Sequence, residues 1–86
     1  MDDTILLQEL EALARDLEVD LRYDEIDGRG GLCRYGGKTR LIMSRDLALP
    51  ERIHLLCRAL SRFELDDRFI RPRLRELIEA QGPAAD

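Results

Sequence analysis

Residues 28–63, GRGGLCRYGGKTRLIMSRDLALPERIHLLCRALSRF, decide the fold of this chain. Two strand-like runs, 31–35 and 38–44, flank Gly36-Gly37, and paired glycines supply the positive φ angles that a two-residue hairpin turn requires. A proline then opens an amphipathic run at 50–63, where its missing N–H is harmless because the first turn of a helix leaves that group unpaired. The stretch therefore predicts a β-hairpin followed by a helix.

The segments on either side of this stretch complete the pattern. Residues 4–17 predict a helix because leucines recur at helical spacing, and residues 72–81 predict a last helix that Gly82-Pro83 ends. Between Val19 and Tyr23 apolar and charged residues alternate, which is typical of a strand with one face in water. The leucines of the first helix are Leu6, Leu10, Leu13 and Leu17.

These elements predict an α+β fold in the order α-β-β-β-α-α, with a small antiparallel three-stranded sheet packed by helices on one face. At 86 residues the chain has the size of one small domain. We assign residues 1–82 to a single α+β domain and residues 83–86 to a frayed C-terminal tail.

The net charge of −4 conceals a basic centre. Residues 29–62 carry eight basic and two acidic side chains, a net charge of +6, whereas residues 1–28 come to −8. Arginines on a shared surface are typical of a site for phosphate groups or another polyanion. The acidic isoelectric point of about 5.0 and the scarcity of aromatic side chains that could stack on bases count against nucleic acid.

The candidate polyanion-binding residues are Arg34, Arg40, Arg58 and Arg62. Arg34 and Arg40 could project from one face of the sheet. Arg58 and Arg62 are one helical turn apart, so they lie on the same side of the predicted helix.

The Gly28–Gly31 segment, with Arg29 inside it, has the glycines of a loop that cradles phosphate through backbone N–H groups. Such loops open a helix, whereas this one opens a strand. We interpret the glycines as a tight turn into the hairpin.

Cys33, His54 and Cys57 form the candidate metal or thiol site. His54 and Cys57 are three residues apart, so they are neighbours on a helix surface, and that helix could cover the strand that holds Cys33. A structural zinc site needs four ligands and a catalytic site needs three with an open position, yet the chain has no Cys-x-x-Cys pair and no second histidine. We favour burial in the core and expect no metal or other cofactor. A small metal- or thiol-dependent enzyme is the alternative.

Leu47, Leu49 and Leu55 lie outside the regular apolar stripes, as does Ile26. Small sheet domains leave unpaired strand edges and gain stability by burying more surface. Exposed apolar side chains would therefore mark a docking surface for a second copy of the chain or for another protein. The alternative is that Leu47 and Leu49 fold under and seal the core, and the sequence leaves both interpretations open.

The chain has no apolar run of the roughly 20 residues that a membrane-spanning helix needs. Its acidic first residues, Met1–Thr4, differ from the basic start of a signal peptide, and two cysteines do not make a disulfide framework. We therefore expect a cytoplasmic protein with reduced thiols and no membrane partner.

From Leu32 to Phe63 the chain resembles zincin-type metallopeptidases of the ImmA/IrrE kind. The likeness rests on the order of elements, a hairpin that ends in the aliphatic run LIMS and then the helix PERIHLLCRALSRF, together with Glu51, Arg52 and Leu60. The zinc-binding motif of that family, His-Glu-x-x-His, falls on RALSR at residues 58–62.

Both zinc-ligand positions of that motif are arginine here, at Arg58 and Arg62, and the general-base position is Ala59. Arginine has no lone pair for zinc. The resemblance thus implies a remnant scaffold without metal or peptidase activity. The whole chain also resembles a family of small uncharacterised bacterial proteins, through its GGLCR hairpin and the PRLRELIE run at residues 72–79. That second likeness implies a bacterial protein and adds no activity.

No nucleophile–base pair, metal set or cofactor loop is complete in this sequence. We therefore predict a non-enzymatic protein-interaction or accessory domain, which docks to itself as a dimer or to another protein. Binding of nucleic acid or another polyanion through residues 29–62 is the alternative function.

Overall fold

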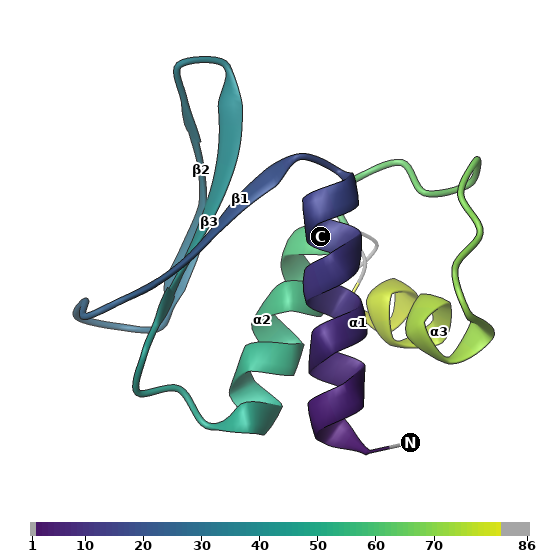
Figure 1. Ribbon diagram of the computed structural model, residues 1–86, viewed down its shortest axis with the longest axis horizontal. Coiled ribbons are helices and arrows are strands. Elements are labelled where there is room, and N and C mark those ends of the chain that lie inside the picture. The colour runs from purple at the N-terminus through teal and green to yellow at the C-terminus, as the bar shows by residue number, and fades with distance from the viewer. Residues whose placement is uncertain (1, 82–86) are drawn as a thin grey trace.

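The structure, a computed structural model, describes residues 2–81 and contains three helices and three strands in that range (Figure 1). In chain order they are α1 (Asp3–Asp16), β1 (Val19–Asp24), β2 (Gly30–Tyr35), β3 (Lys38–Ser44), α2 (Leu49–Leu60) and α3 (Pro72–Ala80). The predicted α+β class and the order α-β-β-β-α-α are confirmed. The tail expected at residues 83–86 lies outside the described residues.

The sheet is mixed, which corrects the prediction of an antiparallel one. β3 is the central strand, paired with β1 in parallel and with β2 in an antiparallel hairpin. Leu41 of β3 lies opposite Leu21 on one side and Leu32 on the other. Alternation of apolar and polar residues indicates which face of a strand is buried, but it carries no information on which strand lies beside which.

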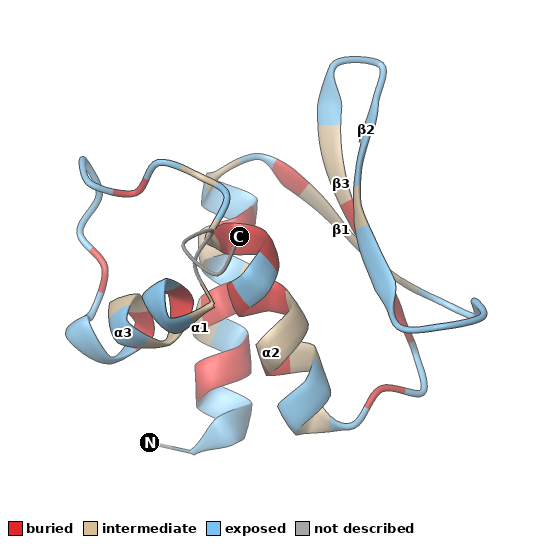
Figure 2. Cartoon of the chain, turned by 180° about the vertical axis from the view of Figure 1, so that it is seen from behind, coloured by how far each residue is buried: buried red, intermediate tan, exposed pale blue. Residues whose placement is uncertain are grey.

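The segment between β1 and β2 crosses the end of β3. The carbonyl oxygen of Asp24 accepts a hydrogen bond from the Arg45 N–H at 3.0 Å, and that of Arg29 accepts one from the Ser44 N–H at 3.0 Å. The two bonds hold the end of β3 between the end of β1 and the start of β2. Residues 25–28, between these two points, project beyond the sheet as an exposed turn (Figure 2).

α1 and α2 lie side by side over one face of the sheet, and α3 packs on the far side of this helix pair (Figure 1). Within the described residues no helix covers the opposite face, which we term the open face of the sheet (Figure 1). The side chains between the sheet and the helices form one core. Its largest fully buried members are Leu10, Leu41, Met43, Leu56, Cys57 and Leu60.

α1 has a capped start and a left-handed end. The Asp2 carboxylate accepts a hydrogen bond from the Thr4 N–H at 2.9 Å, which satisfies one of the free donors of the first turn. After the helix, Glu18 takes a positive φ of 61°, the conformation in which many helices end. The chain turns there into β1.

α2 ends at Leu60, three residues before the predicted end. The N–H groups of Arg62 and Phe63 bond to the carbonyl oxygens of Ala59 and Leu60 at 3.2 and 3.1 Å, so the chain tightens into three-residue turns. Arg62 therefore lies just after the end of α2, in a tight turn that continues directly from the last helical turn.

A polar contact orients α2 against α1 and β1. The Arg52 guanidinium donates to the carbonyl oxygens of Leu47 and Arg45, both at 3.0 Å, and lies 5.1 Å from the centroid of the Tyr23 ring. The Tyr23 hydroxyl donates to the Glu11 carboxylate. Burial and this carboxylate raise the pKa of Tyr23 far above its usual value, so the phenol remains a donor. The contact holds α2 at a fixed position beside the sheet.

Candidate functional site

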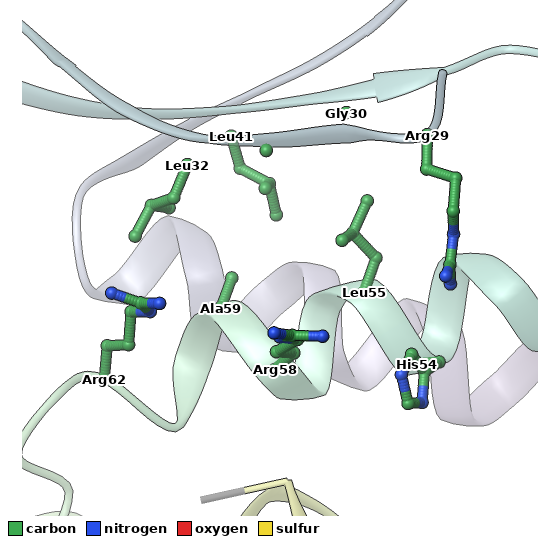
Figure 3. Close-up of a pocket in the computed structure, with 10 residues that line it drawn as sticks. Arg29, Gly30, Leu32, Leu41, His54, Leu55, Arg58, Ala59 and Arg62 are labelled. Atoms are coloured by element: carbon green, nitrogen blue, oxygen red, sulfur yellow. The ribbon is translucent and has the colours of Figure 1, made fainter. Parts of the chain in front are cut away.

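A groove with a volume of about 370 Å³ separates β2 from α2 (Figure 3). Among the described residues no acidic side chain lines it, and we term it the basic groove. Its apolar bed consists of Leu32, Leu41, Leu55 and Ala59, and its nitrogen-bearing side chains are Arg29, His54, Arg58 and Arg62.

The groove exists because small residues stand where its two walls approach each other. A Cβ atom at Gly30 would lie 2.0 Å from the carbonyl oxygen of Ile42, and the residue has a φ of 122°. Only glycine tolerates both conditions, so position 30 carries no side chain that could fill the space between β2 and α2. On α2, Ala59 follows Leu55 by one turn, and its methyl group leaves space under β2 (Figure 3).

Three guanidinium groups reach the groove from two sides. Arg29 comes from the start of β2, and Arg58 and Arg62 come from the end of α2 (Figure 3). All three residues are exposed. Within the part of the chain that the structure describes, none of them takes part in an ion pair. The groove therefore has a positive potential that favours an anionic ligand.

Two side chains that line this groove, Arg29 and His54, are not among the four candidate polyanion-binding residues. Arg29 was counted in the basic segment 29–62 and in the glycine-rich segment before the hairpin, and His54 was grouped with the cysteines. His54, Arg58 and Arg62 are spaced by four residues, which places them along one side of a helix. That spacing could have identified His54. Arg29 had no such signal, because its position depends on how β2 lies against α2.

Arg34 and Arg40 do not share a face of the sheet, so that part of the polyanion prediction is wrong. Side chains alternate between the two faces along a strand, and the register places Arg40 opposite Cys33, the neighbour of Arg34. Arg40 therefore lies on the open face. Arg34 is exposed on the other side of β2, outside the residues that line the groove.

The open face of the sheet neutralises its own arginines. The Asp20 carboxylate accepts hydrogen bonds from Arg22 Nε at 3.2 Å and from Arg40 Nε at 2.9 Å. These two hydrogen bonds, that of Arg22 first, hold the pKa of Asp20 below its usual value. Arg40 also lies 5.4 Å from the centroid of the Tyr35 ring. Arg22 and Arg40 thus have partners, which the groove arginines lack among residues 2–81.

Cys33, His54 and Cys57 do not come together. Cys33 is exposed on the open face, His54 lines the groove, and Cys57 is buried in the core, where burial raises the pKa of its thiol to about 11. The expected burial is therefore right for Cys57 and wrong for Cys33. In the described range, no group of three or more His, Cys, Asp or Glu residues could hold a metal ion.

The three leucines proposed for docking have different environments. Leu47 is only 8% exposed and belongs to the core, which corrects its assignment to a docking surface. The physical reason is that the loop before α2 folds under the sheet and is held there by the bond from Arg52 to the Leu47 carbonyl oxygen. Leu49 is half-buried against the core, and Leu55 is half-buried in the bed of the groove.

No protein-family model, curated protein or solved structure matches the chain. The zincin resemblance therefore stays a hypothesis. Arg58 and Arg62, on which that resemblance would place the two histidines, both line the groove. Of the helices within residues 2–81, none has both the length and the apolar character required to cross a membrane.

Proposed function

We propose that this protein is a non-enzymatic interaction domain that binds an acidic protein segment in the basic groove. The observation that carries the proposal is the groove itself, in which three arginines without carboxylate partners among the described residues surround an aliphatic bed. Guanidinium groups form strong bidentate hydrogen bonds with carboxylates. The aliphatic bed offers contact area that a small inorganic anion would leave unused, so a segment with both acidic and apolar side chains suits the groove best.

The charged side chains of the groove are suited to binding rather than to proton transfer. Arginine stays protonated at physiological pH and has five donors and no acceptor. Arg58 and Arg62 would also repel a metal cation. This composition supports the hypothesis that the chain is a metal-free remnant of a zincin-like scaffold, whose former catalytic cleft now serves recognition.

The groove favours an acidic peptide over nucleic acid, the alternative ligand. Its apolar lining residues are aliphatic, and in the described structure no aromatic side chain lines it for stacking on bases. The whole chain carries a net charge of −4, so it repels a long polyanion at a distance. A short acidic segment is affected mainly by the groove, because charges separated by more than about 8 Å are largely screened at physiological salt.

Fluorescence anisotropy with a labelled peptide of alternating glutamate and leucine residues, the Glu–Leu probe, tests this function. We expect binding that weakens as salt is added. Reversal of the groove charge by Arg58→Glu/Arg62→Glu should lower the affinity by at least about tenfold, or about 1.4 kcal/mol. The matched control Arg68→Glu/Arg73→Glu makes the same change of net charge at exposed residues outside the groove, and it should leave the affinity nearly unchanged.

Equal losses in the two variants would show that net charge, and not the groove, governs the interaction. The absence of binding to the Glu–Leu probe at low salt, at a protein concentration at which light scattering shows a monomer, would contradict the proposed function. Tighter binding of an oligodeoxythymidylate with the same number of charges, lost in the Arg58→Glu/Arg62→Glu variant, would favour the nucleic-acid alternative instead.

A further inference from the structure

The turn between β1 and β2 combines acidic and apolar side chains on an exposed projection. Residues 24–27 read Asp-Glu-Ile-Asp, and all four are exposed, including Ile26 at 36%. We term them the acidic turn. None of the ion pairs among residues 2–81 involves a carboxylate of this turn. The turn extends from the sheet on the side away from α1 and α3 (Figure 2).

The acidic turn and the basic groove are complementary in chemistry. The turn has three carboxylates around one aliphatic side chain, and the groove has three arginines around an aliphatic bed. Such a match of charge and apolar surface is the arrangement that specific interfaces use. The turn is therefore a segment of the kind that the groove is proposed to bind.

The turn of one molecule does not fill its own groove. Its two ends are tied to the end of β3 by the bonds that Asp24 and Arg29 accept, and it projects away from α2 (Figure 1). Arg29 is at once the residue that ends this connection and a residue that lines the groove. Turn and groove are therefore neighbouring parts of one surface. Two copies related by a two-fold axis can each place the acidic turn in the basic groove of the other.

We infer that the protein forms a two-fold dimer in which the acidic turn of each copy lies in the basic groove of the other. The inference rests on the proposed function, because it names the acidic segment that the groove binds. The exchange makes two equal contacts and closes on itself, so it gives a dimer and no filament.

Charge also decides against the other simple dimer, in which the free edges of two β2 strands pair. In an antiparallel pairing of β2 with β2 centred between Leu32 and Cys33, Arg34 of each copy would lie diagonally across from Arg29 of the other. Like charges placed across neighbouring strands are destabilising. The exchange of turns instead sets each basic groove against carboxylates.

A reciprocal charge swap tests the dimer, with the solution mass measured by light scattering. For the wild-type chain we expect twice the 9.9 kDa of one copy at low salt and a shift towards the monomer at high salt. The groove variant Arg58→Glu/Arg62→Glu and the turn variant Glu25→Arg/Asp27→Arg should each be monomeric. In the first, acids oppose acids in both contacts, and in the second, bases oppose bases.

A mixture of the two variants should restore the dimer, because each turn then meets a groove of opposite charge. The control Arg68→Glu/Arg73→Glu should remain dimeric. Cooperative urea unfolding shows whether each variant is folded, and Glu25→Gln/Asp27→Asn, which only removes charge, replaces the turn variant if that variant does not fold. It should weaken the dimer without reversing the contact.

Any of three results would overturn the inference. The wild-type chain could be a monomer at low salt and high protein concentration, the single variants could stay dimeric, or their mixture could stay monomeric. The Glu–Leu probe separates this failure from failure of the proposed function. A monomer whose groove still binds the probe, with the loss expected for Arg58→Glu/Arg62→Glu, keeps the function and removes only the dimer. A monomer that binds no probe removes both.

Discussion

The two faces of the sheet hold arginines in opposite electrostatic settings. On the open face, Arg22 and Arg40 share the carboxylate of Asp20. On the face towards the helices, the arginines of the basic groove have no such partner among the described residues, and an aliphatic bed lies between them. A basic stretch of sequence is therefore not itself a binding site. An arginine attracts an anionic ligand more strongly where the folded chain leaves its charge uncompensated.

The two faces also differ in how deeply their apolar side chains are buried. Leu41 is 1% exposed beneath the helices, whereas the next residue, Ile42, is half-buried on the open face. The bed of the groove is thus the outer part of the core, whereas Ile42 on the open face is only partly buried. The largest effect that we predict follows from this contrast.

Leu41→Ala should destabilise the protein by about 2–5 kcal/mol, because it removes a fully buried side chain and leaves a cavity. Ile42→Ala should cost only about 1 kcal/mol, the usual size of a single substitution. Urea unfolding followed by circular dichroism measures both as shifts of the midpoint at constant slope. In a domain this small the first loss can exceed the total stability, so Leu41→Val serves as the milder variant. Equal losses at the two positions would mean that the open face is covered as well.

The helices and strands could be predicted because the apolar residues in each recur at the helical or strand period, which places them on the side that faces the core. β3 was placed correctly at Lys38–Ser44, and α1 begins and ends within one residue of the predicted range. The end of α2 was placed three residues too late, because Phe63 continues the helical stripe and still packs against the core although the chain there has left the helix. The parallel pairing of β1 with β3 could not be predicted, since it is set by backbone pairing of Val19–Asp24 with Thr39–Ser44, which does not depend on the pattern of apolar side chains.

The site could be predicted only in part. Arg58 and Arg62 followed from helical spacing, which is a local property. The inclusion of Arg29 and the exclusion of Arg40 both depend on which strand edge faces α2 and on which face each side chain lies. Sequence gives the charge of a residue, and only the fold decides whether a carboxylate such as Asp20 neutralises it.

The two cysteines test the same difference between faces by their reactivity. A disulfide reagent at pH 8 should label Cys33 rapidly and Cys57 only after unfolding, because Cys33 is exposed and Cys57 is 2% exposed. With a pKa of about 11, the Cys57 thiol is only about 0.1% ionised at that pH. Cys33→Ser should abolish the rapid phase, and Cys57→Ser should abolish the slow one. Rapid labelling of both thiols in the folded protein would contradict the buried position of Cys57.

The raised pKa of Cys57 also sets the sign of a pH effect on stability. The folded state keeps the thiol protonated, while the unfolded chain ionises near the usual value of 9.0. The contribution of this group to stability is therefore complete below pH 9 and is lost as the pH rises from 9 towards 11. The urea midpoint of the wild-type chain should fall faster over this interval than that of Cys57→Ala.

The smallest effect that we predict is that of Asp20→Asn, which removes the charge that neutralises the open face. The pKa of Asp20 is depressed below the usual 3.8 by its arginine partners, so its contribution to stability is present above that pH and is lost as the pH falls through the depressed value. The urea midpoint of Asp20→Asn should lie slightly below that of the wild type at pH 7, and the two should converge in acid. High salt should also reduce the difference, because the ion pairs are exposed.

The same substitution leaves Arg22 and Arg40 without an anionic partner among residues 2–81 and so makes the open face resemble the groove in charge alone. If uncompensated arginines were sufficient for binding, Asp20→Asn introduced into the Arg58→Glu/Arg62→Glu variant would restore affinity for the Glu–Leu probe. We expect no restoration in fluorescence anisotropy, because among the described residues the open face offers the leucines of the probe Ile42 and no row of aliphatic side chains, and exposed charges alone hold a ligand weakly. Arg22→Gln in the same background is the control that makes the open face less basic. Restored binding would show that charge is sufficient and that the shape of the groove is irrelevant to recognition.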